Sequence, residues 1–466
     1  MTRVHTLQFL GGVGTVTGSR FLVRSDRANV LVDAGLFQGG RELRERNWAS
    51  PPFDPATLDA VVITHAHVDH CGYLPRLMTA GYRGPVFVTP TTAELMGIVL
   101  PDCGHLQEEE AGFANRTGIS RHEPALPLYT EDDARRALGL LRPTPFGDRL
   151  EIAPGVELTF SRAGHILGAA TVALRLGVDG PVLAVSGDLG RPSHPLFVSP
   201  DAPPEADVLL VESTYGDRCH DDAGALGRLA DAIARTVERG GTVLIPAFAV
   251  DRTEVLLHHL SSLAASGRLP EGVPVYVDSP MALDALRVYR AAIERGDPDI
   301  QVDGWTGLDP FDVPGLREIR SVEESKSLNE PDRPSILISA SGMATGGRVV
   351  HHLAHLLSEP ENTIVLVGFQ AEGTRGRRLL DGEQELKMLG RYVRVRAEIV
   401  DLPAFSVHAD ATELLDWVGR SPVEPDTVFT VHGEPAASAA LASSIHETLG
   451  WSAIVPRPFE KVRLGR

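Results

Sequence analysis

The chain has 466 residues, of which 43% are hydrophobic and 23% charged, and its formal net charge is −18. This length exceeds what one hydrophobic core usually supports, so we expect two domains. The acidic balance argues against a protein that coats nucleic acid, because non-specific duplex binders are usually basic. It does not exclude a nuclease that reads its substrate in a local pocket containing metal cations.

Sequence features that direct proteins to membranes or the cell exterior are missing. No run of about 18 apolar residues is present, and the N-terminus lacks a charged segment followed by an apolar one, so neither a membrane span nor a signal peptide is indicated. The three cysteines Cys71, Cys103 and Cys219 are scattered and form no C-x-x-C pair. This usage predicts a reducing compartment, and we expect a cytoplasmic protein.

The first predicted elements are strands joined by a glycine-rich loop. Residues 4–10 and 20–24 have strand character, and the loop Gly11–Gly18 lies between them. Because a strand and not a helix follows this loop, it does not form a dinucleotide-binding fingerprint. A third strand is expected over residues 29–32.

The segment His65-Ala66-His67-Val68-Asp69-His70 follows the apolar run Ala60–Ile63 and is the most informative feature of the chain. Extended residues alternate faces and rise about 3.3 Å each, so a strand ending at His65 could direct His65 and His67 to one point. A turn would carry Asp69 and His70 to a second point nearby. Four ligands in so short a stretch suit two metal ions sharing a bridging water better than one tetrahedral ion with an open position.

A long helix and further strands are expected next. Thr91 and Glu94 form a capping-box pattern that predicts a helix running towards residues 107–110. Strands are predicted over residues 156–160, 171–176 and 182–185.

After about residue 215, helical segments alternate with short apolar strands, which predicts βαβ units and a parallel sheet. Helices are expected over residues 224–240, 251–266, 281–296 and 348–357, and strands over residues 242–245, 273–277, 335–339 and 363–367. Asp251 and Glu254 form a second capping-box pattern. The Pro/Asp/Gly-rich residues 297–333 are expected to be irregular.

Three further polar residues each follow an apolar run and could complete a two-metal site. They are His165 in Ala163–Ala169, Asp188 in Leu183–Arg191 and His432 in Val428–Glu434. Singly, a histidine beside glycine at a strand end is weak evidence for a metal ligand. Two other histidine pairs, His351/His355 and His258/His259, lack a metal-binding pattern and are not expected to be ligands.

Taken together with H-x-H-x-D-H, these segments resemble, in order and local sequence, the metallo-β-lactamase superfamily. Glu212–Gly216 (ESTYG) and Phe405–Asp410 (FSVHAD) resemble the motifs of its β-CASP branch, the nucleic-acid-processing nucleases. Within that branch, the chain resembles the bacterial and archaeal homologues of the eukaryotic pre-mRNA 3′-end cleavage endonuclease. The resemblance covers essentially the whole chain.

This resemblance implies an α/β fold, namely an αββα metallo-β-lactamase sandwich with an inserted α/β β-CASP domain that contains a mainly parallel sheet. The implied catalytic domain comprises residues 1–216 and 401–466, and the insertion residues 217–400. Two Zn²⁺ ions per chain are implied, with His65, His67 and His165 holding one ion and Asp188 bridging both. The other ion would be held by Asp69, His70 and His432. Neutral imidazole and carboxylate suit zinc.

The implied reaction is hydrolysis of single-stranded RNA by metal-activated hydroxide, as an endonuclease or a 5′-to-3′ exonuclease, leaving 5′-phosphate and 3′-hydroxyl ends. Asp69 could accept the proton of the attacking water. His408 is the family's candidate general acid and Glu212 its partner. A phosphate-binding loop is expected between a strand and a helix, where backbone N–H groups are exposed. It comprises Ser341, Gly342, Gly346, Gly347 and Arg348.

Three other functions can be compared with these residues. A DNA-acting nuclease of the same branch usually carries an apolar residue where His432 stands, so His432 favours RNA by family analogy. A non-catalytic subunit of an RNA-processing complex would not be expected to keep every ligand. A small-molecule hydrolase would not need the second α/β domain or the Glu212/His408 pair. A homodimer is a further expectation from the family.

Overall fold

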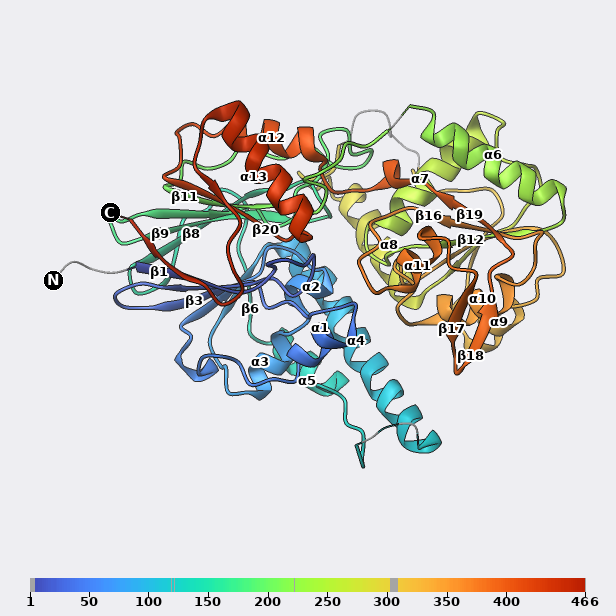
Figure 1. Ribbon diagram of the computed structural model, residues 1–466, viewed down its shortest axis with the longest axis horizontal. Helices are drawn as coiled ribbons and strands as arrows, with labels where there is room; N and C mark the ends of the chain where they lie inside the picture. Colours follow the sequence, from blue (N-terminus) through green and yellow to red (C-terminus); the bar gives the residue numbers. More distant parts are fainter. Residues whose placement is uncertain (1–4, 119, 121, 222, 302–308, 466) are drawn as a thin grey trace. The chain divides into compact units, whose positions relative to one another are not determined.

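The computed structural model describes residues 5–118, 120, 122–221, 223–301 and 309–465 (Figure 1). The chain folds into two compact units: unit 1 comprises Met1–Cys219 and His408–Arg466, and unit 2 comprises His220–Val407. No helix among the described residues is long and apolar enough to cross a membrane. The three cysteines are free.

Unit 1 contains two seven-stranded sheets that face each other, with helices on the outside of both (Figure 1). The first sheet has the strand order β22 (Lys461–Leu464), β1 (His5–Gly11), β2 (Arg20–Arg24), β3 (Asn29–Val32), β4 (Ala60–Val62), β5 (Val86–Val88) and β6 (Leu141–Pro143). The second has the order β21 (Ala453–Ile454), β20 (Thr427–Val431), β11 (Val208–Glu212), β10 (Val182–Val185), β9 (Ala170–Leu176), β8 (Val156–Arg162) and β7 (Leu150–Ala153).

The core of unit 1 lies between these sheets. Side chains alternate between buried and partly exposed along β1 and β8, as expected for strands with one face on a core. Phe9 of the first sheet contacts Phe429 of the second, with ring centroids 5.1 Å apart. Each fully buried side chain of this kind stabilises the fold by roughly 1.5–3 kcal/mol.

The helices of unit 1 flank the sandwich. They are α1 (Arg41–Arg46), α2 (Val68–Cys71), α3 (Leu74–Thr79), α4 (Pro90–Thr117), α5 (Glu131–Leu138), α12 (Ala411–Gly419) and α13 (Pro435–Leu449), with a 3₁₀ turn at Pro55–Thr57. Helix α4 begins earlier than the predicted Thr91/Glu94 box. Thr89 is its N-cap, and the Thr89 side chain accepts a hydrogen bond from Thr92 N. The helix can begin here because Pro90 fits the first helical position and has no N–H that needs an acceptor.

Unit 2 is built around a parallel sheet with the order β14 (Leu316–Glu318), β13 (Val275–Asp278), β15 (Ser335–Ser339), β12 (Thr242–Pro246), β16 (Thr363–Leu366) and β19 (Glu398–Asp401). The connecting helices are α6 (Ala225–Glu238), α7 (Arg252–Ala265), α8 (Pro280–Glu294), α9 (Val322–Ser327), α10 (Arg348–Leu356) and α11 (Arg375–Leu380), with a 3₁₀ turn at Pro403–Phe405. Strands β17 (Glu385–Met388) and β18 (Arg391–Arg394) form a hairpin. The fold class expected from the sequence is confirmed in both units.

Two local expectations for unit 2 differ from the structure. Asp251 precedes α7 with a φ of 70° and makes no side-chain cap, so it does not form the predicted box with Glu254. Glu254 is instead buried, and burial together with the charge of Asp251 raises its pKa well above the ordinary value. The region 297–333 contains β14 and α9 rather than being wholly irregular, and residues 302–308 of it lie outside the described residues.

The strand ends of unit 1 place polar residues together. Strands β10, β11 and β20 are parallel neighbours. Asp188 and His432 follow β10 and β20, and Glu212 is the last residue of β11. Because parallel strands end at one edge of a sheet, these three side chains emerge side by side.

Candidate metal centre

The H-x-H-x-D-H segment leaves β4 and enters the short helix α2. His65 lies in the segment between β4 and α2, His67 is the N-cap of α2, and Asp69 and His70 lie within this four-residue helix. The predicted division of this segment between two points is what the structure shows. His65 and His67 belong to one group of possible metal ligands, and Asp69 and His70 to another.

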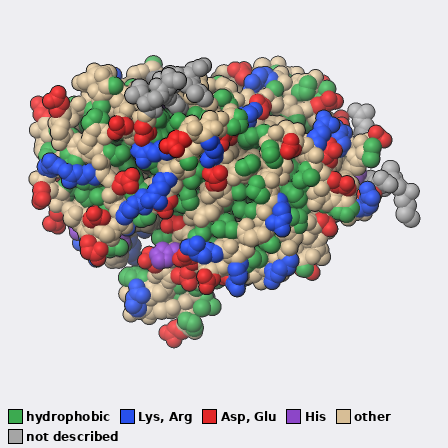
Figure 2. Space-filling view, turned by 180° about the vertical axis from the view of Figure 1, so that it is seen from behind, with side chains coloured by type: hydrophobic (Ala, Val, Ile, Leu, Met, Phe, Trp, Pro, Cys, Tyr) green, Lys and Arg blue, Asp and Glu red, His purple; other side chains and the backbone are tan. Residues whose placement is uncertain are grey.

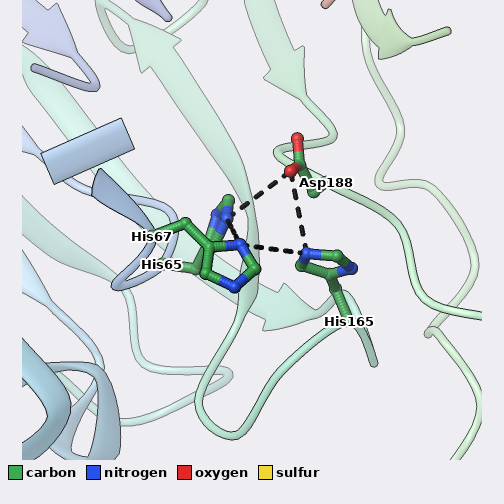
Figure 3. Close-up of side chains that lie close together, drawn as sticks. All are labelled: His65, His67, His165 and Asp188. Carbon is green, nitrogen blue, oxygen red and sulfur yellow. Dashed lines mark hydrogen bonds and ion pairs between the residues drawn. The ribbon is translucent and has the colours of Figure 1, made fainter. Parts of the chain in front are cut away.

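The first group contains His65, His67, His165 and Asp188, whose ligand atoms converge (Figure 3). His67 Nδ1 lies 3.1 Å from His65 Nε2 and 3.3 Å from His165 Nε2. Asp188 Oδ2 lies 3.5 Å from His65 Nε2 and 3.7 Å from His165 Nε2. A tetrahedral zinc ion with bonds of about 2.0–2.1 Å keeps its ligand atoms about 3.3 Å apart, so these separations fit one zinc.

The second group contains Asp69, His70 and His432. His432 Nε2 lies 3.2 Å from His70 Nε2 and 3.4 Å from Asp69 Oδ2. The other oxygen of Asp188, Oδ1, lies 3.2 Å from His70 Nε2. Asp188 therefore offers one oxygen to each group, which is the arrangement of a ligand shared by two ions.

The protonation states also suit a metal site. Burial, together with the neighbouring imidazoles, lowers the pKa of His65, His67 and His165, so these rings are neutral and have nitrogen lone pairs to donate. Burial would likewise lower the pKa of His70, but Asp188 and Asp33 outweigh it and raise the pKa well above its ordinary value. The carboxylates of Asp188 and Asp33 thus favour positive charge beside them, which a bound cation would supply.

The residue that orients His70 did not stand out in the sequence. Asp33, just after β3, accepts a hydrogen bond from His70 Nδ1 at 2.7 Å, and its two oxygens also accept from the backbone N–H and hydroxyl of Thr64. Thr64 Oγ1 lies 3.0 Å from His65 Nδ1. A carboxylate behind a ligating histidine fixes its tautomer and strengthens it as a ligand. The signal for Asp33 in the sequence was an aspartate directly after an apolar strand.

Replacing Asp33 with Asn should weaken zinc binding by roughly 10–100-fold, because the carboxylate that orients His70 is lost. Titration against a chromophoric chelator measures this change. Asp59→Asn is the matched control, since the Asp59 carboxylate accepts a hydrogen bond from Asn29 N at the opposite end of β3 and its replacement should leave the affinity unchanged. Equal affinities for wild type and Asp33→Asn would show that Asp33 does not support the site.

Backbone contacts hold α2 against the turn after β3. Ala34 N donates to His70 O at 2.7 Å, and Leu36 N donates to Val68 O at 2.9 Å. A Cβ at Gly35 would lie 1.6 Å from Asp69 O, so only glycine permits this approach. The two turns are therefore locked together beneath the ligands.

Glu212 and His408 meet beside the first ligand group. His408 Nδ1 lies 3.1 Å from Glu212 Oε1, and Glu212 is completely buried. The two oxygens of Glu212 also accept hydrogen bonds from the backbone N–H groups of Leu189 and Thr214. The His408 ring contacts that of His165 with centroids 4.3 Å apart and ring planes tilted by 47°, and its Nδ1 is 4.0 Å from Asp188 Oδ2. His408 thus adjoins the ligands without belonging to either group.

The predicted phosphate loop connects β15 to α10 in unit 2. Gly347 is the N-cap of α10 and makes no side-chain cap, and Ser341 Oγ accepts a hydrogen bond from Thr345 N. Gly346 lies between Thr345 and Gly347 in the same turn. Gly342 is a packing residue, because a Cβ there would lie 2.7 Å from the ring of Phe248.

The expectation that Arg348 provides a fork for phosphate is not supported by its surroundings. Its guanidinium pairs with the buried carboxylate of Asp278 at 2.5 Å and donates to the carbonyl oxygens of Ile319 and Arg320. These partners balance the charge of the guanidinium and accept hydrogen bonds from its N–H groups. The histidine pairs His351/His355 and His258/His259 belong to no metal-holding group among the described residues.

Three family models match the chain. They are the metallo-beta-lactamase superfamily over residues 13–93, the Beta-Casp domain over residues 253–379 and the Zn-dependent metallo-hydrolase RNA specificity domain over residues 392–456. The chain is 39% identical to Ribonuclease TTHA0252 of Thermus thermophilus over 432 residues, which are 92% of this chain and 94% of that protein. It is 33% identical to the transcription termination factor FttA of Pyrococcus horikoshii, over 98% of this chain and 70% of that protein.

A solved structure shares the fold. A protein of unknown function from Enterococcus faecalis V583 superimposes with a TM-score of 0.51, covering 99% of this chain and 100% of that chain at 16% sequence identity. This likeness concerns the fold alone.

Proposed function

Because the chain belongs to the β-CASP branch of the metallo-β-lactamase superfamily, among its RNA-processing nucleases, we propose that it is a two-zinc ribonuclease acting on single-stranded RNA. The observation that carries the proposal is the pair of ligand groups joined by Asp188, with the Glu212–His408 pair beside them. His65, His67 and His165 would hold one zinc and Asp69, His70 and His432 the other, with Asp188 serving both.

The reaction is an in-line hydrolysis of a phosphodiester. When bound, the two ions supply Lewis acidity that stabilises the charge on the phosphoryl oxygens and makes water a competent nucleophile. The water oxygen forms a bond to phosphorus while the bond to the ribose 3′-oxygen breaks, which leaves 5′-phosphate and 3′-hydroxyl ends. Asp69 accepts the proton of the attacking water.

The leaving 3′-oxygen receives its proton from His408. Because His408 Nδ1 faces the buried carboxylate of Glu212, the opposite nitrogen, Nε2, is the one that passes the proton. The carboxylate stabilises the protonated ring and holds its orientation, which are the two requirements for a general acid.

RNA rather than DNA is the proposed substrate on two grounds. The relatives that match over most of the chain are named as a ribonuclease and as a transcription termination factor. In addition, His432 occupies the position where DNA-acting members of the branch usually have an apolar residue. On the face drawn in Figure 2, acidic and basic side chains are interspersed, so substrate recognition is assigned to local sites such as the turn formed by Ser341, Gly346 and Gly347.

Product mapping tests the proposal. A single-stranded RNA labelled at either end, bearing a 5′-phosphate or a 5′-hydroxyl, should give fragments with 5′-phosphate and 3′-hydroxyl ends. Internal fragments indicate endonucleolytic cleavage, and released mononucleotides indicate 5′-to-3′ exonucleolytic cleavage. Products with 3′-phosphate or cyclic phosphate ends would contradict the proposed bond cleavage, and no cleavage would favour a non-catalytic subunit.

A further inference from the structure

The two chain segments that connect unit 1 with unit 2 are both fixed to the first turn of α12. The chain leaves unit 1 after Cys219 and re-enters it at His408. On the outgoing segment, Arg218 O accepts a hydrogen bond from Ala411 N at 3.1 Å, and Cys219 Sγ lies 3.2 Å from Thr412 Oγ1. The proposed general acid, His408, is thus the first residue after the insertion, and it closely precedes Asp410, the N-cap of α12.

An ion pair anchors α12 to the loop that carries Asp188. The guanidinium of Arg191 donates from Nε and Nη2 to the carboxylate of Glu413, at distances of 3.1–3.3 Å. The same carboxylate accepts a hydrogen bond from Asp410 N at 2.9 Å and so closes the capping box of α12. The Arg191 side chain is 9% exposed and that of Glu413 is 19% exposed. Partial burial and a forked geometry distinguish this pair from ordinary surface ion pairs.

The loop to which Arg191 belongs is itself rigidly placed. Leu189 N donates to Glu212 Oε1 at 3.0 Å, and a Cβ at Gly190 would lie 1.7 Å from Gly164 O, next to His165. The loop contacts the returning segment through a bridge between Gly190 and His408 and through a hydrogen bond from Ala409 N to Leu189 O. Arg191 extends these contacts to the start of α12.

We propose that Arg191 and Glu413 are positioning residues that hold His408 where it can protonate the leaving group. This proposal rests on the proposed ribonuclease function. Arg191 and Glu413 are not among the possible metal ligands, and their ion pair fixes the start of α12, so we expect their main effect to fall on the acid. A general acid must lie within hydrogen-bond reach of its target, and a displacement of about 1 Å can cost up to about a hundredfold in rate.

Changing the leaving group distinguishes positioning of the acid from a merely structural role. In normal RNA, breaking the bond from phosphorus to the 3′-oxygen requires a proton from His408. In RNA with one bridging 3′-sulfur, the sulfur leaves as a thiolate and needs no proton, since a thiol pKa is about 8.5. Misplacement of the acid should therefore slow only cleavage of the oxygen linkage.

The variants are Arg191→Lys, which keeps the charge but lacks the fork, and Glu413→Gln, which keeps the cap acceptor but lacks the charge. Arg135→Lys is the matched control, since Arg135 makes an exposed ion pair with Glu131 in α5. Single-turnover rates are measured on the oxygen and sulfur linkages in the full-length protein, with zinc content and thermal unfolding recorded alongside.

Both variants should cleave the oxygen linkage roughly 10–100-fold more slowly than wild type and the sulfur linkage nearly as fast, with zinc content unchanged. His408→Ala should show the same pattern, and Arg135→Lys should behave as wild type. Equal losses on both linkages, loss of zinc, or no loss would overturn the positioning role. A wild-type protein that cleaves neither linkage would instead overturn the proposed function.

Discussion

Replacing Asp188 with Asn is expected to abolish RNA cleavage and to reduce bound zinc from two ions per chain to one or fewer. Asp188 directs Oδ2 to His65 and His165 and Oδ1 to His70. An asparagine has the same shape but presents an N–H₂ group, a donor, to one of the two ligand groups. It also removes a negative charge that would help to hold both cations.

The rate loss should be large. Removal of a single preorganised electrostatic contact typically costs on the order of 10²–10³ in kcat, and Asp188 would contact both ions, so a loss of at least about 10³ is expected. Metal analysis and RNA cleavage are measured on the same preparation. Asp201→Asn is the control, because Asp201 lies in unit 1 on an exposed segment where it accepts from Arg162 N. Two tightly bound zinc ions and full activity in Asp188→Asn would show that Asp188 is not the shared ligand.

Replacing His408 with Ala should lower kcat by about 10²–10⁴ while leaving both zinc ions bound, as expected for loss of a general acid. The zinc content is decisive because His408 Nδ1 is only 4.0 Å from Asp188 Oδ2. The structure places His408 outside both ligand groups, with its Nδ1 directed to Glu212. Loss of zinc in His408→Ala would make His408 a ligand and leave the reaction without a proton donor.

Glu212→Gln tests the partner of the acid. The amide keeps one oxygen for Leu189 N or Thr214 N but no longer stabilises a protonated His408. Its activity on the oxygen linkage should fall, by less than in His408→Ala, because the ring itself remains. A Glu212→Gln rate equal to the wild-type rate would remove Glu212 from the reaction.

The features predicted well from sequence are those encoded locally. The H-x-H-x-D-H segment indicates its two groups of possible metal ligands within six residues, and apolar runs marked the strands that precede His165, Asp188 and His432. The structure brings all seven predicted ligands into two groups. Strand–helix alternation also predicted the parallel sheet of unit 2.

The features that sequence did not reveal depend on contacts between distant residues. Asp33 reads as a turn residue, and its role follows only from the pairing of β3 with β4, which sets it beside Thr64 and His70. The sequence suggested that the Arg348 guanidinium could bind phosphate, but in the structure it pairs with Asp278, 70 residues earlier. Arg191 and Glu413 are 222 residues apart in the chain, so no local pattern joins them.

The most direct test of the ribonuclease assignment compares a single-stranded RNA with a DNA of matched sequence, using wild type and Asp69→Ala loaded with zinc. The assignment predicts that wild type cleaves the RNA and leaves the DNA intact, and that Asp69→Ala cleaves neither. Cleavage of the DNA with the RNA left intact would contradict it.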